Sequence, residues 1–227
     1  MSEGFIDLWP TTLLARHLPG AEPANAALMQ LLLQLESGYN ANADQTKDGA
    51  ETASTNLRPD LTSSYLQQDL LSVEHPAIHW LASCINKTVA DYLRNSGVDI
   101  DVSWQIQAWA NINRLGDYHN LHNHPHSYLS GTYYVHLPDV NKQQAGSRSD
   151  LDPGAISFFD PRGQANMTAI KGDGQIDPEH RVQPVAGQIL LWPSFLHHFV
   201  HPNLSSEHRI SVSFNVILKM TKELLPA

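Results

Sequence analysis

Apolar and polar residues alternate along this chain with two different periods. In the first hundred residues, two segments repeat apolar positions every three to four residues, which is the period of an amphipathic helix. We therefore predict helices over residues 22–37 and 75–96. Gly38 is expected to end the first helix and Asn95-Ser96-Gly97 the second, because glycine readily adopts the conformation found just beyond many helices.

From residue 98 onward, apolar positions alternate with mostly polar ones, which is typical of a strand with one buried face. The apolar residues of the first such run are Val98, Ile100, Val102, Trp104, Ile106 and Ala108. Other strand-like runs lie at residues 5–14, 128–137, 154–160, 165–170, 182–185, 187–192, 196–201 and 209–218. Turns rich in Gly, Pro, Asp and Asn separate many of them. The pattern predicts a mainly β fold with N-terminal helices, arranged as an antiparallel sandwich or jelly roll.

Length and composition are those of a globular protein. The chain has 227 residues, of which 41% are hydrophobic and 16% charged, enough for one sizeable core. We expect a single domain over residues 1–227, with 1–100 as helical support and 101–227 as the jelly-roll core. Residues 40–64 are polar and are expected to form a long loop, either a surface excursion or a lid.

The net charge of −9, without a basic cluster, argues against nucleic acid or an anionic membrane as a partner. A small anionic molecule stays compatible as a ligand, because one local arginine can outweigh the overall charge.

The only cysteine, Cys84, excludes an internal disulfide and a cysteine-rich zinc site. There is no leader-like N-terminus and no apolar run of about 18 residues, so a cytoplasmic protein is expected.

Histidines carry the chemical information. Nine of the 13 fall in two windows, residues 119–136 and 197–208. His122 and His124 would share one face of a strand, so their imidazoles could bind one metal ion, with a third ligand expected from residues 197–201. The histidines expected to face solvent or substrate, or to support the ligands, are His119, His126, His136, His201 and His208.

Arg209 begins the last apolar strand, and Ser211 has the same parity. A guanidinium that points into a barrel needs an anionic partner, and a carboxylate can accept two hydrogen bonds from it. Arg209 and Ser211 are therefore candidates for binding a carboxylate.

Several motifs together resemble the Fe(II)- and 2-oxoglutarate-dependent oxygenases, over about residues 104–217. The likeness is greatest to a bacterial and phage subgroup with an H-x-H motif. The matching stretches are Asn111-Ile112-Asn113, Gly116 with His122-Asn123-His124-Pro125, Ser130-Gly131-Thr132-Tyr133-Tyr134, Gly187 to Asn203, and Arg209-Ile210-Ser211.

This resemblance implies a double-stranded β-helix that binds Fe(II) and uses 2-oxoglutarate and O₂, releasing succinate and CO₂ as a substrate is oxidised. His122 takes the first metal-ligand position and His198 the distal one. Arg209, assisted by Ser211, takes the position that binds the far carboxylate of 2-oxoglutarate. Two residues of the adjoining strand could also donate hydrogen bonds to the cosubstrate, Tyr134 and Ser130.

His124 departs from the family pattern, which has aspartate at this position. Either His124 is itself the ligand and completes a three-histidine site, or a carboxylate comes from elsewhere, with Asp117 and Asp160 as candidates. We favour His124. A neutral ligand leaves the iron one unit more positive than the usual set would, which alters its redox tuning.

Two other functions fit the same residues. One is a cupin-like three-histidine enzyme, a dioxygenase or a hydrolase, in which Arg209 binds the substrate itself. The other is a non-catalytic jelly-roll binding module that binds no metal tightly. We favour the oxygenase, with a small molecule or an amino acid as substrate; the sequence carries no sign of the oligomeric state.

Overall fold

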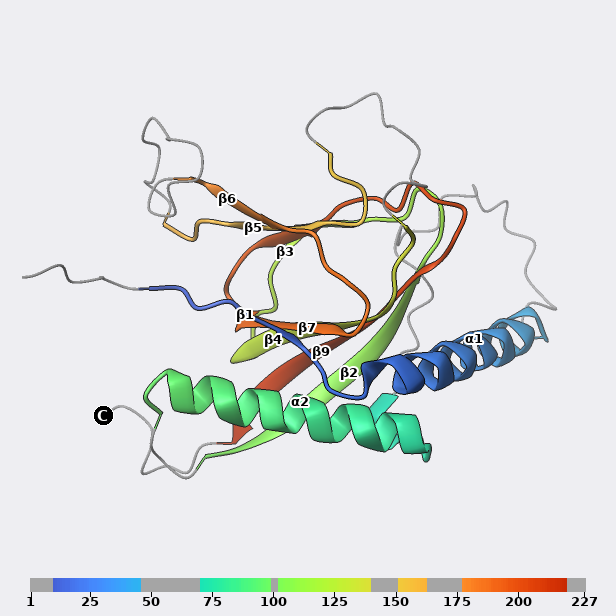
Figure 1. Ribbon diagram of the computed structural model, residues 1–227, viewed down its shortest axis with the longest axis horizontal. Helices are drawn as coiled ribbons and strands as arrows, with labels where there is room; N and C mark the ends of the chain where they lie inside the picture. The colour runs from blue at the N-terminus through green and yellow to red at the C-terminus, as the bar shows by residue number, and fades with distance from the viewer. Residues whose placement is uncertain (1–9, 46–69, 99–101, 140–150, 163–176, 220–227) are drawn as a thin grey trace, which may run out of the picture.

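Two antiparallel β-sheets face each other, and two helices lie beneath one of them (Figure 1). The computed structural model describes residues 10–45, 70–98, 102–139, 151–162 and 177–219. The elements in this part of the chain are β1 (Leu14–His17), α1 (Ala21–Gln45), the 3-10 turn η1 (Leu70–Ser72), α2 (Pro76–Asn95), β2 (Ser103–Asn113), β3 (His119–His122), β4 (Leu129–His136), β5 (Ile156–Phe159), β6 (Glu179–Val182), β7 (Gln188–Pro193), β8 (His198–Val200) and β9 (Arg209–Lys219).

The chain passes repeatedly from one sheet to the other. The larger sheet has the strand order β1-β7-β4-β9-β2, and the smaller one has the order β3-β8-β5-β6. From β2 to β9 the chain alternates between the sheets, except where β5 and β6 follow each other within the smaller one. This winding is a double-stranded β-helix and confirms the predicted jelly roll.

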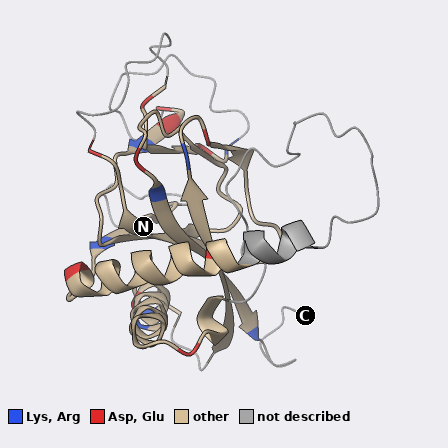
Figure 2. Cartoon of the chain, turned by 90° about the vertical axis from the view of Figure 1, so that its right-hand side faces the viewer, with Lys and Arg blue, Asp and Glu red and all other residues tan. Residues whose placement is uncertain are grey.

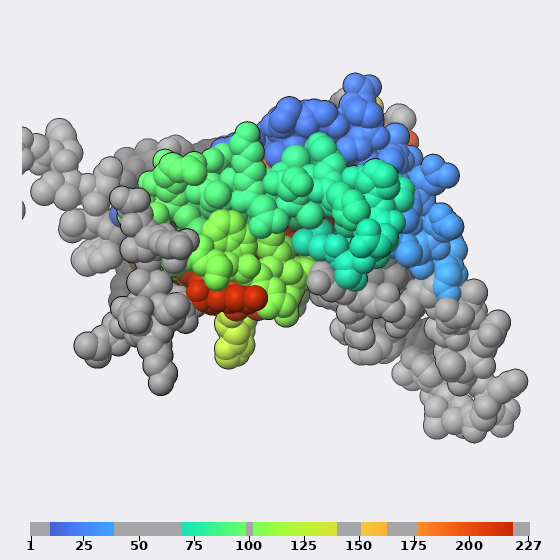
Figure 3. Space-filling model, turned by 90° about the horizontal axis from the view of Figure 1, so that it is seen from below, coloured from blue at the N-terminus to red at the C-terminus, as the bar shows by residue number. Residues whose placement is uncertain are grey.

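Helices α1 and α2 cover the outer face of the larger sheet, as the view from the helix side shows (Figure 3). The apolar stripe of α2 is buried as its period predicts, with Ile78, Leu81, Ile85 and Val89 fully enclosed. Each such side chain contributes roughly 1.5–3 kcal/mol by leaving water. The helices therefore anchor the sheet from outside.

The boundaries of α2 follow the local sequence. His75 caps its first turn, where its Nδ1 accepts a hydrogen bond from the backbone N–H of Ala77 at 3.2 Å, and Pro76 occupies the first helical position. Gly97, just beyond the helix, has φ 74°. The predicted range of 75–96 is confirmed.

The first helix corrects a prediction. We expected it to end at Gly38, but α1 continues to Gln45. Gly38 is exposed inside the helix, where glycine costs only about 1 kcal/mol, too little to end a helix packed on a sheet. The beginning of the predicted polar loop, residues 40–45, is therefore helical, and residues 46–64 lie outside the described residues.

Two strand predictions also change. In the described part of the predicted strand 5–14, residues 10–13 are unpaired, because pairing with β7 begins at Leu14 and continues to His17. Residues 183–185 form a connection, since pairing with β5 ends at Val182. The run at 165–170 lies outside the described residues.

The inner face of the larger sheet carries many polar residues, unlike its outer face. The buried polar residues of β2, β4 and β9 with inward parity are Asn111, Asn113, Ser130, Thr132, Arg209 and Ser211. Charged residues in the described chain otherwise lie mainly in loops and near the ends of elements (Figure 2). Among the described residues, no helix is both long and apolar enough to cross a membrane.

Candidate metal centre

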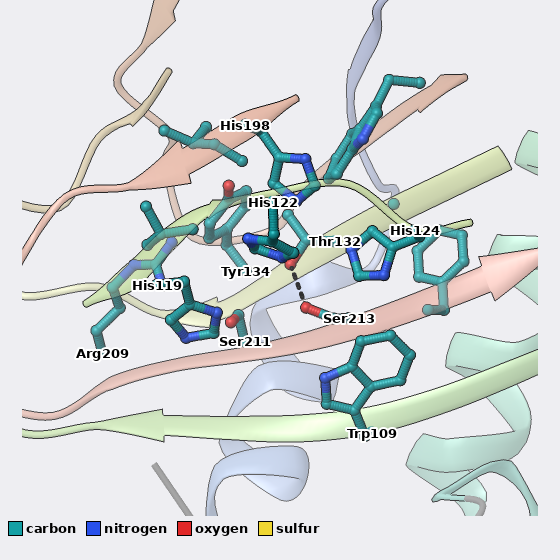
Figure 4. A pocket seen from close by; sticks show the side chains of 15 residues that line it. Trp109, His119, His122, His124, Thr132, Tyr134, His198, Arg209, Ser211 and Ser213 are labelled. Atoms are coloured by element: carbon teal, nitrogen blue, oxygen red, sulfur yellow. Dashed lines mark hydrogen bonds between the residues drawn. The ribbon is translucent and has the colours of Figure 1, made fainter. Parts of the chain in front are cut away.

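A cavity of about 290 Å³ lies between the two sheets. The residues that line it are Trp109, His119, His122, His124, Gly131, Thr132, Tyr134, Ile156, Trp192, His198, Val200, Arg209, Ser211, Ser213 and Phe214. Polar and aromatic side chains dominate this lining (Figure 4). The interior of the jelly roll is therefore a binding site and not only a core.

Three histidines converge in this cavity. His122 ends β3, His124 follows two residues later, and His198 begins β8. One ring nitrogen from each lies within 4.8 Å of the others, and among the described residues this is the only such group of His, Cys, Asp or Glu. Pairing of β3 with β8 places His122 directly opposite His198, which explains how residues so distant in sequence meet.

Backbone carbonyls determine which nitrogen two of these rings present to the cavity. His122 Nδ1 donates to the carbonyl of Asn120 at 2.6 Å, and His198 Nδ1 donates to the carbonyl of Leu196 at 3.1 Å. Because Nδ1 carries the proton in both rings, Nε2 is left as the lone-pair nitrogen. This arrangement is common for histidines that bind metal.

Burial keeps the rings of His198 and His124 neutral. Desolvation and the neighbouring histidines lower the pKa of His198 to about 3, and the same two causes lower the pKa of His124 to about 4. A neutral imidazole can donate its lone pair to a metal ion without first losing a proton.

The loop before β3 is held by Asn203. Asn203 accepts the N–H of Gly116 at its carbonyl, donates its own N–H to the carbonyl of Asp117, and donates Nδ2–H to the carbonyl of Asn113. The Asp117 carboxylate accepts the backbone N–H of Arg114 at 2.7 Å. Asp117 thus helps to shape the turn, at Gly116 with φ 89°, that leads into the histidine motif.

The second candidate carboxylate has another partner. Asp160 forms an ion pair with Arg162, with an Nη2–Oδ2 distance of 2.6 Å, and these hydrogen bonds lower the pKa of Asp160. Neither Asp117 nor Asp160 lines the cavity or belongs to the histidine group.

Arg209 lies in the same cavity, with only 2% of its surface exposed. Its Nη1 donates to the Asn113 side-chain oxygen at 3.4 Å, and its Nε has no hydrogen-bond partner among the described residues. No ion pair joins it to a carboxylate in the described part of the chain. Burial lowers its pKa from the ordinary value, although a guanidinium stays charged. The site therefore contains a buried positive charge that lacks an anion.

Tyr134 stands beside Arg209, whose guanidinium carbon lies 5.4 Å from the centre of the tyrosine ring. Within the described part of the chain the buried Tyr134 hydroxyl also has no hydrogen-bond partner, and desolvation raises its pKa to about 12. Ser211 lines the cavity as well. Ser130 does not line it, and its hydroxyl donates to Asn215 at 2.8 Å.

The sequence predictions missed Asn113 and Ser213, and they left His119 open as a residue that faces solvent or substrate or supports the ligands. His119 and His122 are three apart, so a regular strand would point them to opposite faces. An irregularity in the pairing of β3 with β8, between these two residues, lets both line the cavity. The Asn-Ile-Asn motif at residues 111–113 was the signal available for Asn113.

The remaining histidines of the two windows and several aromatic residues differ in whether they reach this cavity. His126, His136, His201 and His208 do not line the histidine cavity, whereas Trp109 and Trp192 do. Tyr118, Phe159 and His201 line a second hollow of about 650 Å³.

Comparison with known proteins identifies the family. Residues 107–215, from β2 to β9, match the profile of the family described as "Putative 2OG-Fe(II) oxygenase". The matched segment contains the three histidines and Arg209. Residues 107–215 belong to the 2-oxoglutarate- and iron(II)-dependent oxygenases. The matched segment thus carries the profile of a family of oxidoreductases that use iron and 2-oxoglutarate. No curated protein sequence matches it.

Solved structures share the fold of this oxygenase at low sequence identity. A prolyl-4-hydroxylase from Pseudomonas putida is 13% identical with a TM-score of 0.53, covering 92% of this chain and 93% of the other. A prolyl hydroxylase from Trichoplax adhaerens is 13% identical with a TM-score of 0.53, covering 90% and 83%. HygX from Streptomyces hygroscopicus, with nickel and 2-oxoglutarate bound, is 14% identical with a TM-score of 0.52, covering 96% and 90%. These likenesses extend to the fold alone.

The residues of the oxygenase fit iron and 2-oxoglutarate. Three imidazoles are suitable ligands for Fe(II). The unpartnered Arg209 Nε and Tyr134 hydroxyl provide donors for a carboxylate at the buried end.

Proposed function

We propose that this oxygenase binds Fe(II) through His122, His124 and His198 and binds 2-oxoglutarate through Arg209, Tyr134 and Ser211. It then oxidises a small-molecule or amino-acid-like substrate, with hydroxylation of a C–H bond as the expected outcome. Bound iron and 2-oxoglutarate supply the oxidising chemistry, in which O₂ is consumed and succinate and CO₂ are released.

One observation carries the proposal: the histidine group and the buried guanidinium of Arg209 open into the same cavity. A buried charge without a partner is costly, so its retention calls for an anionic ligand. A dicarboxylate that chelates a metal through one end and meets Arg209 with the other would satisfy both features.

His124 is proposed as the third ligand in place of a carboxylate. Its support is that its ring nitrogen is within 4.8 Å of those of the other two histidines, while Asp117 and Asp160 bond to other groups. Replacing an anionic ligand with a neutral one makes Fe(II) a stronger electron acceptor toward the anionic cosubstrate. We therefore expect the site to depend on 2-oxoglutarate to neutralise the metal.

The protein surroundings hold the ligands in place and exclude water. Trp192 packs edge-on against His198 with ring centres 5.0 Å apart, and Phe158 packs against Trp192 at the same distance. These rings are buried and limit the rotation of His198. Because its Nδ1–H is held by Leu196, His198 has only Nε2 to offer.

The cavity volume bears on the substrate. About 290 Å³ is at the lower end of the roughly 300–1,000 Å³ typical of small-molecule sites. After the cosubstrate is bound, the cavity has room for only the reacting part of a substrate. The remainder of the substrate would lie outside, where Leu121 and Phe195 are exposed large apolar residues beside the histidine segments.

An anaerobic titration tests the proposal. Fe(II) and then 2-oxoglutarate are added to the metal-free protein, and the visible charge-transfer band of the chelate is recorded. We expect a band that requires both additions. It should be lost in His198→Ala and His124→Ala, while Arg209→Ala should keep iron binding and lose affinity for 2-oxoglutarate.

Other results would redirect or refute the proposal. Iron binding without a band in the wild type would favour a three-histidine enzyme that does not use 2-oxoglutarate. A band of full strength in His124→Ala would exclude His124 as a ligand. His197→Ala is the matched control, because His197 is exposed next to His198 and its loss should change nothing.

A further inference from the structure

Asn113 connects the buried arginine to a fourth histidine of the cavity. Its side-chain oxygen accepts from Arg209 Nη1 at 3.4 Å, and its Nδ2 lies 3.2 Å from His119 Nε2. Asn113 is fully buried, so neither contact is shared with solvent. Arg209 and His119 both line the cavity, and Asn113 links them. The function proposed above leaves His119 without a role.

The hydrogen-bonding capacities of these three side chains determine which atom of each one donates and which accepts. A guanidinium can only donate, so the Asn113 atom facing it is the carbonyl oxygen. The Asn113 NH₂ group therefore faces His119 and donates to Nε2. Since Nε2 is the acceptor, a neutral His119 carries its proton on Nδ1.

His119 is held in this neutral state by its surroundings. Desolvation, then the charge of Arg209 and the neighbouring histidines, lower the pKa of His119 to about 3. The ring lines the cavity, and Asn113 is its only hydrogen-bond partner among the described residues. Its Nδ1–H is thus a donor without an acceptor among the residues that the structure describes.

The position of this donor indicates what it would contact. The His119 ring centre lies 6.4 Å from that of His122, and in the close-up His119 lies near Arg209 and Ser211 (Figure 4). A ligand extending from the metal group to Arg209 would pass along this ring.

We propose that His119 is a cosubstrate-binding residue: it donates an Nδ1–H hydrogen bond to the carboxylate of 2-oxoglutarate that Arg209 binds, and Asn113 is the positioning residue that fixes its tautomer. This inference rests on the proposed function. It adds a further neutral donor, beside Tyr134 and Ser211, that recognises the distal carboxylate without bringing another charge close to the metal.

Three variants distinguish the roles of the two ring nitrogens of His119. His119→Asn keeps a donor near the Nδ1 position, His119→Gln keeps an acceptor near Nε2 for Asn113, and His119→Phe removes both. Affinities for Fe(II), and then for 2-oxoglutarate, are measured anaerobically for each. We expect 2-oxoglutarate to bind about tenfold more weakly to the Gln and Phe variants, the loss of one hydrogen bond to a charged group, and within about threefold of wild type to the Asn variant.

A second ligand controls for indirect effects on the metal. 2-Oxobutyrate has the same metal-chelating 2-oxo acid group but no distal carboxylate, so its affinity should be the same in wild type and in His119→Gln. Equal losses for both ligands would mean that His119 acts on the iron site, and no loss for either would mean that it makes no contact; both results overturn the inference. If wild type binds iron and no 2-oxoglutarate, the proposed function fails together with it.

The tautomer can be measured without any ligand. In metal-free protein with ¹⁵N-labelled histidine, two-bond nitrogen–proton correlations should show His119 protonated on Nδ1. Asn113→Leu should lose this preference while keeping the fold, as judged by the amide spectrum. An Nε2-protonated ring in wild type would contradict the inference whatever the binding data show.

Discussion

Arg209 presents an unusual energetic situation at the scale of a single residue. It is 2% exposed, its Nε is unpartnered, and no carboxylate in the described chain pairs with it. The free energy of unfolding of an ordinary folded protein is only about 5–15 kcal/mol, and a buried charge without an anion costs part of it. We therefore infer that Arg209 is retained for binding. The sequence predicted the residue and its anion-binding role, and burial explains why the anion would be needed.

We expect Arg209→Met to stabilise the metal-free protein, by roughly 1 kcal/mol or more, because an apolar side chain of similar length removes an uncompensated buried charge. The same variant should not bind 2-oxoglutarate. Urea unfolding with Arg94→Met as control, a residue whose side chain is 75% exposed, measures the difference. A loss of stability greater than that of Arg94→Met would show that the guanidinium has sufficient partners within the protein.

The buried histidines should make the metal-free protein sensitive to acid. The folded pKa of His198 is about 3, below its ordinary value of 6.5, so the unfolded chain binds more protons between these values. Stability is therefore complete above about pH 6.5 and falls as the pH is lowered, by up to about 1.4 kcal/mol per pH unit for this residue. His124 and His119 act in the same direction.

Unfolding free energies of chelator-treated protein between pH 7 and pH 5 test this sensitivity. His198→Phe should show a slope lower by about one proton over the window from 6.5 to 5. An unchanged slope in the variant would mean that His198 titrates normally in the folded protein.

At the scale of elements, β4 shows how the wall of the cavity is built. Tyr134 lines the cavity, and the Phe214 ring of β9 occupies the space beside Gly131. A Cβ atom on Gly131 would lie 2.4 Å from the Phe214 ring and 2.7 Å from the carbonyl oxygen of Leu190. The glycine of the Ser-Gly-x-Tyr-Tyr motif is thus required by packing.

Gly131→Ala should destabilise the protein by about 1–3 kcal/mol, because the enclosed Phe214 ring and the β7 backbone must both move. Gly38→Ala is the matched control. A Cβ there meets nothing within 4 Å, and alanine in an exposed helical position should stabilise by about 0.5–1 kcal/mol. Denaturant midpoints of the two variants should shift in opposite directions, and a shift in the same direction would contradict this account.

At the scale of the whole molecule, the metal group joins segments that are distant in sequence. His122 and His124 precede His198 by more than 70 residues, and only the pairing of β3 with β8 brings them together. A metal ion bound there would connect these segments in the folded state alone, so binding should raise the stability of the entire sandwich.

Thermal unfolding tests this connection. Mn(II), a redox-inert substitute for Fe(II), at about one hundred times its dissociation constant should stabilise wild type by about 2.7 kcal/mol. For a chain of this size that corresponds to a rise in Tm of roughly 5–10 °C. 2-Oxoglutarate should add to the shift only when the metal is present, and His198→Ala should show neither shift. An equal rise in His198→Ala would assign the metal to another site.

Much of this architecture was predictable because its signals are local. The helical period of residues 75–96, the alternation in the strands and the turn residues all express backbone preference and one-sided burial, which a sequence displays directly. The resemblance of motifs to the oxygenases correctly predicted the double-stranded β-helix. It also named His122, His198 and Arg209, which the structure brings into one cavity.

What the sequence determined by itself was therefore the types of element, the family and the residue types suited to a metal and a carboxylate. The tertiary structure decided which of them meet. Continuation of α1 past Gly38, the paired length of β1 and the entry of His119 into the cavity all depend on contacts with distant segments. A local pattern carries no information about the register of a strand with a partner 80 residues away, and that register determines which side chains share a cavity.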